Sequence, residues 1–440
     1  MNTPIYDFLT QYSSSDTLRC HMPGHKGRSF SGAMHELSRL DITEIKGADS
    51  LFEADGIIAQ SERNMASLYG SAAAAYSAGG STLCIQAMLA IMKQEGRTVY
   101  AVRNVHRAFL NAAALLGIEV DWIMPEYSGG ILSGRIGPET VRKAMSGSKN
   151  AALYVTSPDY TGRIADIAAL AEVCHDIGAR LIVDNAHGAH LAFFERNIHP
   201  ISLGADMCCD SAHKTLPALT GGAYLHISRA ASASLRESAK TAMAMFGSTS
   251  PSYLTLASLD LCNRYLADGY QNRLREMCGH LEEAQKALTA AGWQIEPSDP
   301  LRLTVRAPAG MTGGQLANRL RESGVECEYA DPDFLVLMLT PENSAADIER
   351  LLHAFGTNDA VYAPQPSLPL ARGERVCSAR EALFAPRETI PAAQSLGRVC
   401  GAPTVGCPPA IPIAVSGERI GPEALELFRR YGVERVEVLR

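Results

Sequence analysis

The chain has 440 residues, of which 46% are hydrophobic and 20% are charged, and its formal net charge is −7. A chain of this length is expected to form two or more packed units, and its composition excludes disorder along the whole chain. The basic residues are scattered without a basic run, so the charge pattern predicts no nucleic-acid partner. No stretch approaches the ~18 apolar residues that a spanning helix needs, and we expect no membrane partner.

The N-terminus and the cysteines predict the compartment. Residues 1–7 lack the basic start and apolar stretch of a secretory signal. The eleven cysteines are odd in number and show no paired C-x-x-C spacing. Several lie in apolar segments, which indicates buried reduced thiols and a cytoplasmic protein.

The first sixty residues are predicted to be irregular, and regular alternation begins near Ser61. Helical periodicity covers residues 62–69, 83–93, 106–116 and 167–177. Runs with strand character cover residues 98–102, 151–156, 180–184, 206–210 and 223–227. This alternation predicts an α/β fold with a mostly parallel sheet that helices cover on both faces.

After a long helix over residues 272–291 the pattern changes to a smaller α+β unit. Its predicted strands are 301–306, 325–329 and 334–339, and its predicted helices are 314–322 and 344–355, the second begun by Ser344-x-x-Asp347. A last helix–strand pair is expected from Pro422. The predicted divisions are an N-terminal arm (1–60), a large domain (61–270), a small α+β domain (271–360) and a C-terminal segment (361–440).

Two strand ends carry the strongest chemical pattern. The strand over residues 180–184 delivers Asp184, and the next strand is followed by Ser211, His213 and Lys214. Open α/β sheets bind ligands at the carboxyl ends of their strands. A lysine that condenses with an aldehyde, beside a carboxylate that keeps a pyridine nitrogen protonated, suits pyridoxal 5′-phosphate (PLP). Alone, Asp184 would be read as a helix cap and Lys214 as a surface lysine; together they favour the cofactor.

A candidate phosphate site lies in Gly79-Gly80-Ser81-Thr82, between an apolar strand and a helix. A helix N-terminus presents free N–H groups, and Ser81 and Thr82 add hydroxyl donors. Most such turns are only helix caps, but PLP carries a phosphate that Ser211 could also reach. The spacing of a nucleotide P-loop is absent.

Several longer segments resemble the ornithine/lysine/arginine decarboxylase family, whose members are PLP enzymes of fold type I. These segments run from about residue 20 to residue 260, with a weaker trace at the C-terminus. They are His21-Met22-Pro23-Gly24-His25-Lys26, Asp41-Ile42-Thr43-Glu44, Gly80-Ser81-Thr82, Arg103-Asn104-Val105-His106, Asp184-Asn185-Ala186-His187-Gly188-Ala189-His190 and Asp210-Ser211-Ala212-His213-Lys214-Thr215.

The resemblance implies a role for each matching residue. Lys214 would hold PLP as a Schiff base, Asp184 would pair with the pyridine nitrogen, and His213 would be a candidate proton donor. The remaining cofactor contacts would be Ala186 beneath the ring, His106 stacked on its other face, His187 nearby, and Ser81, Thr82 and Ser211 at the phosphate.

The family also implies a homodimer or larger homo-oligomer, since a second subunit completes each site. The segment 247–253, which contains Thr249, resembles the part that crosses to the neighbour's phosphate.

Each histidine has a plainer interpretation as well. His106 could simply be a polar residue at a helix start, and His21 and His25 could line the site or brace a loop. His187 and His190 could suggest a metal pair, but without a third ligand we predict no metal.

The substrate class follows from the resemblance alone. The short chain is similar to the family members linked to arginine decarboxylation and polyamine synthesis, which favours arginine over lysine or ornithine. A cationic substrate tail needs a carboxylate, for which Glu44, Asp49, Glu53 and Glu418 are candidates. The family's Tyr-Pro-Pro-Gly-Ile-Pro run reads Cys407-Pro408-Pro409-Ala410-Ile411-Pro412 here, which weakens the transfer of substrate identity.

Two other functions stay open at this stage. An aminotransferase or a β-eliminating lyase of fold type I would use the same lysine, carboxylate and phosphate site. A non-catalytic regulatory protein could keep the decarboxylase fold, although the set Asp184, His213 and Lys214 argues against it.

Overall fold

The computed structural model describes residues 1–127, 131–362, 372–405 and 411–440. Two compact units are present: residues 1–95 with 180–272, and residues 96–179 with 273–440. Within the described ranges, no helix is long and apolar enough to cross a membrane. The divisions expected at residues 60, 270 and 360 remain predictions.

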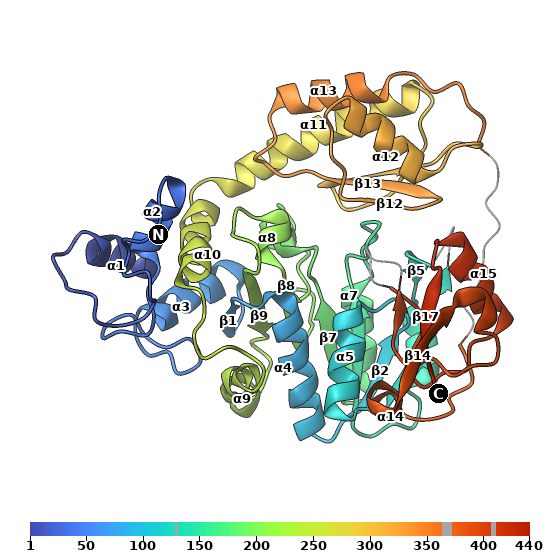
Figure 1. Ribbon diagram of the computed structural model, residues 1–440, viewed down its shortest axis with the longest axis horizontal. Coiled ribbons are helices and arrows are strands. Elements are labelled where there is room, and N and C mark those ends of the chain that lie inside the picture. The colour runs from blue at the N-terminus through green and yellow to red at the C-terminus, as the bar shows by residue number, and fades with distance from the viewer. Residues whose placement is uncertain (128–130, 363–371, 406–410) are drawn as a thin grey trace. The chain divides into compact units, whose positions relative to one another are not determined.

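Four strands form the sheet of the first unit. Their order is β1 (Ala73–Ser77), β9 (Ala223–Ile227), β8 (Met207–Asp210) and β7 (Arg180–Asp184), as Figure 1 shows. β7 and β8 are parallel, whereas β9 runs antiparallel to both β8 and β1. Every residue of β8 and β9 is buried, which matches their continuous apolar character.

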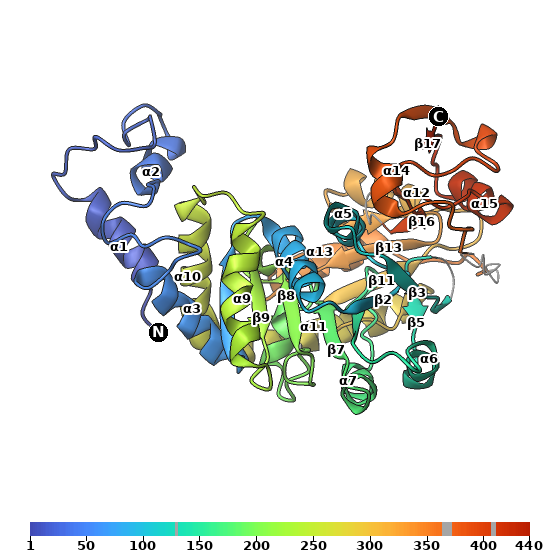
Figure 2. The same cartoon turned by 90° about the horizontal axis from the view of Figure 1, so that it is seen from below.

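Helices α4 (Gly80–Gln94) and α9 (Ala233–Ala244) pack against each other and against β9. Helices α3 (Ile57–Tyr69) and α10 (Tyr253–Ala267) pack against each other and against β1. Figure 2 shows α9 and α4 beside β9. Nine residues of α4 are buried, so this helix is apolar on most of its surface.

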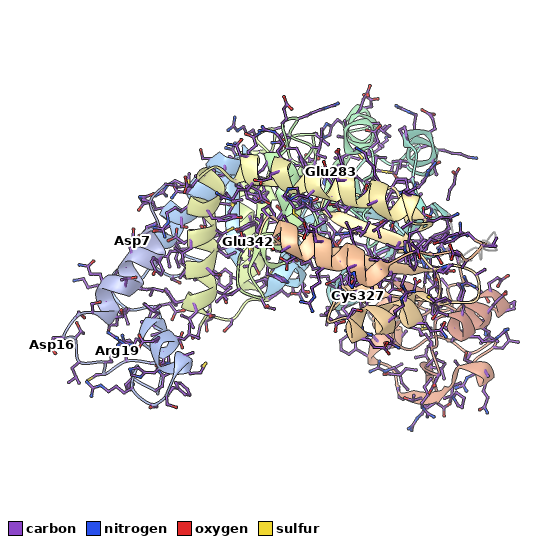
Figure 3. All side chains as sticks on the ribbon, turned by 90° about the horizontal axis from the view of Figure 1, so that it is seen from above. Asp7, Asp16, Arg19, Glu283, Cys327 and Glu342 are labelled. Carbon is purple, nitrogen blue, oxygen red and sulfur yellow. The ribbon has the colours of Figure 1, made fainter. Side chains whose placement is uncertain are left out.

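The prediction that the first sixty residues are irregular was wrong. They contain α1 (Pro4–Ser13) and α2 (Ala33–Leu40), besides the start of α3. Proline at the first turn of α1 is compatible with a helix, and Ile5 and Leu9, four residues apart, are both buried. Asp260 of α10 accepts the N–H groups of Ile5 and Tyr6 at 2.8 and 3.0 Å, a tertiary cap invisible in the local sequence. Figure 3 labels Asp7 on α1 and Asp16 and Arg19 in the segment that follows it.

In the second unit, β2 (Thr98–Val102) lies between β3 (Val120–Ile123) and β6 (Ala151–Thr156) and is parallel to both. The accompanying helices are α5 (Arg107–Leu116), α6 (Pro138–Ala144) and α7 (Ile167–Asp176). β3 was not predicted, because it is a short outer strand that is only partly buried. Parallel pairing in both units agrees with the predicted mostly parallel sheet.

The smaller α+β part contains the antiparallel order β10 (Ile295–Glu296), β11 (Arg302–Arg306), β13 (Phe334–Met338) and β12 (Tyr329–Ala330). Its helices are α11 (Tyr270–Ala290), α12 (Gly313–Glu322) and α13 (Ala345–Phe355), and Figure 3 labels Glu283 on α11. The capping box of Ser344 and Asp347 is confirmed. The strand predicted at 325–329 was misplaced: β12 begins only at Tyr329, after residues that are exposed or half-buried.

The C-terminal part adds short paired strands. β14 (Arg387–Pro391) pairs with β17 (Arg435–Leu439), and α15 (Pro422–Arg430) precedes β17, which confirms the predicted last helix–strand pair. The remaining short elements are β4 (Glu126–Tyr127), β5 (Gly134–Arg135), η1 (Ala189–Phe193), α8 (Ala212–Thr215), α14 (Ala379–Phe384), η2 (Ala392–Gln394), β15 (Thr404–Val405) and β16 (Pro412–Ala414).

Candidate active site

Asp184 lies where β7 ends, in the interior of the first unit. Its side chain is buried, with 2% exposure, and Oδ1 accepts the backbone N–H of Ala186 at 3.2 Å. In the parallel register Asp184 stands opposite Cys209, whose thiol donates to the same oxygen at 3.7 Å. The strand end therefore fixes a buried carboxylate at the edge of the sheet where ligands of α/β folds bind.

Lys214 is carried by α8, the short helix that follows β8. Its Nζ lies 2.9 Å from Nε2 of His187, in the segment after β7. The neighbouring His213 has Nδ1 2.9 Å from the carbonyl oxygen of Gly222. Because a carbonyl oxygen only accepts, Nδ1 of His213 carries a proton, and its other nitrogen, Nε2, can take part in proton transfer.

The expected phosphate site lies at the start of α4. This helix begins at Gly80, earlier than the predicted residue 83, so Ser81 and Thr82 belong to its first turn. Gly80 has φ +69°, a conformation that glycine adopts without strain. The Ser211 hydroxyl donates to the Ser81 hydroxyl at 2.9 Å, while Thr82 is exposed. Two hydroxyl groups and the N–H groups of a helix start suit a phosphate.

The structure describes three more of the predicted contacts, and their part in cofactor binding stays a prediction. Ala186 is buried two residues after Asp184. His106 belongs to the second unit, where its exposed side chain caps α5 by accepting the N–H of Ala108 at 3.1 Å. Thr249 lies in the exposed segment between α9 and α10. His25 pairs with Asp41 at 3.1 Å, in agreement with the loop-bracing interpretation.

The first unit therefore brings together a lysine, a buried carboxylate and a hydroxyl-lined helix start. These are the groups that PLP requires for its aldehyde, its ring nitrogen and its phosphate. The residues fit this cofactor, and when bound it would supply the electron-accepting ring.

Sequence reasoning missed a buried cluster beneath this edge. Asp210, the last residue of β8, is fully buried, and its Oδ1 accepts from Nδ2 of Asn185 at 2.7 Å. Its Oδ2 lies 3.0 Å from Nε2 of His199 and 3.2 Å from Nε2 of His226. Burial alone would raise the pKa of Asp210, but His199 and His226 hold it below the usual range. No sequence pattern pointed to the two histidines, since they meet Asp210 only in the folded chain.

Two of the carboxylates that were candidates for a substrate cation already have partners in the structure. In the second unit, Glu418 binds Arg103 through both oxygens, at 3.0 and 2.6 Å, and both side chains are buried. Its charge is thus already compensated, which argues against the substrate role.

The Asp49 carboxylate is also already hydrogen-bonded, since it accepts backbone N–H groups at the start of α3 and from the residues just before it. Burial raises the pKa of this carboxyl, but the backbone donors outweigh it and leave the pKa lowered. The substitutions at Cys407 and Ala410 lie outside the described residues.

Comparison with known proteins agrees with this site. Residues 3–307 match the family model described as Orn/Lys/Arg decarboxylase, major domain. An arginine decarboxylase of Bacillus subtilis (strain 168) is 29% identical over 461 residues, covering 96% of this chain and 92% of that protein.

Two solved structures extend the likeness to the fold. The lysine decarboxylase LdcF of Francisella novicida is similar with a TM-score of 0.82 at 16% identity, over 100% of this chain and 81% of that chain. A structure of SPT with PLP is similar with a TM-score of 0.54 at 17% identity, over 67% of this chain and 74% of that chain. These matches confirm the predicted fold type I architecture.

Proposed function

The chain belongs to the Orn/Lys/Arg decarboxylase family, and from this premise we propose that it removes carbon dioxide from a basic amino acid, with arginine favoured. Family membership makes it a PLP-dependent amino-acid decarboxylase, as the sequence predicted.

The observation that supports the site assignment is the grouping of Lys214, Asp184, Ser81 and Ser211 in one compact unit. Lys214 would bind the cofactor covalently through Nζ. Asp184 would hold a proton at the ring nitrogen, and the serines would hold the phosphate. Nε2 of His213 would deliver a proton to the substrate Cα, while its Nδ1 stays on the Gly222 carbonyl.

Arginine is favoured because curated relatives over most of the chain are arginine decarboxylases, at 29% identity in two cases. The product would then be the corresponding guanidino amine, and the pathway polyamine metabolism. Lysine is the second candidate, since a solved structure that is similar with a TM-score of 0.82 is a lysine decarboxylase.

Glu44 is our candidate for the distal cation of the substrate. One of its carboxylate oxygens accepts from the Thr43 hydroxyl. The other, Oε1, is buried and has no hydrogen-bond partner among the residues that the structure describes. A buried carboxylate oxygen without a donor is costly, and a guanidinium or ammonium group would satisfy it.

We propose a homodimer whose interface includes the exposed surface of the N-terminal segment. Five large apolar side chains between residues 18 and 37 are exposed by 41–73%, namely Leu18, Met22, Phe30, Met34 and Leu37. A concentration of exposed apolar groups is typical of a protein interface, and a second copy of the chain would cover it. The exposed Thr249 segment would then reach the phosphate of the partner subunit's cofactor.

We also propose a cytoplasmic location. Ten cysteines in the described part of the chain are free thiols, and six of them are buried. Reduced thiols of this kind suit a reducing compartment.

The deciding experiment supplies purified protein and PLP with arginine, lysine or ornithine in separate reactions and traps the released carbon dioxide. Release from one substrate, with formation of the matching amine, would support decarboxylation and identify the amino acid. A lysine-bound cofactor without carbon dioxide from any of the three would reject the basic-amino-acid assignment. An oxo acid as the product would indicate transamination instead.

A further inference from the structure

The Asp210 cluster places three buried side chains around one carboxylate. Asn185 donates to Oδ1, and two imidazoles from different segments approach Oδ2. Asp210, Asn185, His199 and His226 are each buried to 0% exposure. A carboxylate removed from water in this way is held in its ionised form only if its oxygens receive hydrogen bonds or opposite charge.

The position of the protons on His199 follows from its backbone contact. The N–H of Ile201 points at Nδ1 of His199 at 3.4 Å, so this nitrogen accepts. Nε2 therefore carries the proton and donates to Asp210 at 3.0 Å. Cys208 is also near, with Sγ 3.9 Å from Nε2 of His199, and these groups lie close enough to surround a metal ion. A protonated Nε2 cannot ligate a metal, so the geometry favours a hydrogen-bond network.

Asp210 connects the two strand ends that carry the chemistry. Its Oδ1 bonds Asn185, which directly follows Asp184, and the backbone N–H of Asn185 donates to the carbonyl of Cys209 at 3.0 Å. On its other side, Asp210 directly precedes Ser211, whose hydroxyl meets Ser81. A shift of the Asp210 carboxylate would thus be felt at both the ring and the phosphate ends of the cofactor site.

We propose that Asp210, held by Asn185, His199 and His226, is a positioning residue that sets the orientation of the bound cofactor. This inference rests on the proposed function, because it assumes that Asp184 and Ser211 contact PLP. It assigns Asp210 no contact with the reacting atoms. Its carboxylate holds Asn185 beside Asp184, and its backbone leads directly into Ser211, so a fixed Asp210 fixes the separation between the two.

Asp210→Asn tests the proposal with little change in volume. The amide would lose the charge and turn a donor toward either Asn185 or His199, both of which donate. We expect the PLP dissociation constant to rise about tenfold, the effect of one mispaired buried hydrogen bond. We also expect the induced circular dichroism of the bound cofactor to decrease or change sign, since this signal reports the orientation of the ring.

Asp206→Asn is the matched control. Asp206 lies just before β8, is also buried, and likewise ties β7 to β8 by accepting the N–H of Leu181 at 2.8 Å and Arg180 at 3.0 Å. It belongs to the opposite end of the strands from Ser211. This variant should lower the thermal unfolding midpoint while leaving the PLP dissociation constant and the induced signal of the remaining folded protein unchanged.

A double-mutant cycle with Asn185→Ala distinguishes positioning from a general loss of stability. If Asp210 acts through Asn185, the single and double variants should weaken PLP binding by similar factors, so the effects would not multiply. Equal signals and dissociation constants for Asp210→Asn, Asp206→Asn and the native protein would overturn the proposal. If Asp210→Asn does not fold, Asn185→Ala alone carries the test, and an unchanged signal there would overturn it. Failure of the native protein to bind PLP would instead reject the proposed function.

Discussion

Nζ of Lys214 lies 2.9 Å from Nε2 of His187, which joins α8 to the segment that follows β7. A protonated lysine only donates, so His187 accepts from it at Nε2. An amine must be unprotonated before it can attack an aldehyde. His187 thus places a proton acceptor at the atom that has to lose its proton, and it restrains a long side chain.

Replacing Lys214 with alanine should remove the covalent attachment of PLP. The visible absorption band of the lysine-bound cofactor should disappear, and borohydride should no longer attach PLP to this site. Lys286→Ala, at an exposed position on α11, is the control and should keep the band. A Lys214→Ala protein that retains both the band and turnover would refute the assignment.

Asp184→Asn should keep the shape of the site but lose the charge that holds a proton at the ring nitrogen. We expect turnover to fall about a hundredfold or more, the order found when one preorganised electrostatic group is removed. Part of the PLP should remain bound through Lys214 and the phosphate contacts. Steady-state turnover together with cofactor content measures this, and near-normal turnover would remove Asp184 from its role.

Glu44→Gln should weaken binding of the preferred basic amino acid. Loss of one charge-assisted hydrogen bond predicts a KM about tenfold higher, with a smaller effect on kcat. Glu36→Gln is the matched control, because Glu36 is exposed in the same part of the chain and is not a candidate for binding the substrate cation. Equal kinetic constants for the two variants would reject Glu44 as the cation partner.

Glu418→Gln should destabilise the second unit, because the buried Arg103 would keep a charge without its counterion. Breaking a buried ion pair from one side costs about 3–5 kcal/mol, which predicts a marked fall in the thermal unfolding midpoint. Glu388→Gln removes an ion pair to Arg398 in which both side chains are about two-fifths exposed. This variant should lower the free energy of unfolding by under about 1 kcal/mol. An equal decrease in unfolding free energy in the two variants would show that the buried pair stabilises the protein no more than the exposed one.

Asp260 should make stability depend on pH. Burial raises the pKa of this carboxyl to about 6. Between pH 4 and 6 the folded chain therefore keeps a proton that the unfolded chain releases, and the unfolding free energy should fall as pH rises. The difference between this pKa and the ordinary value of 3.8 corresponds to about 3 kcal/mol of unfolding free energy at most.

Thermal unfolding of the native protein and Asp260→Asn at pH 4.5 and pH 7 measures this dependence. As the pH rises, the unfolding midpoint of the native protein should fall by more degrees than that of Asp260→Asn. Asp16→Asn, at an exposed position, should follow the native protein. Parallel behaviour of the native protein and Asp260→Asn would contradict the raised pKa.

The sequence by itself determined the alternation of strands and helices, and with it the strand ends that carry Asp184 and Lys214. Those features depend on local periodicity and on residues that the parallel topology brings to one edge, so they can be recognised without coordinates. Its resemblance to a decarboxylase family also predicted the cofactor correctly.

Only the tertiary structure decided which partners these residues have. Helix α1 was missed because its cap, Asp260, is distant in the sequence. For the same reason the sequence could not show that Arg103 forms an ion pair with Glu418, or that His199 and His226 lie beside Asp210. Such contacts arise when a buried charge must find its counterion or donor, and that choice depends on which side chains the packed chain brings within hydrogen-bond distance.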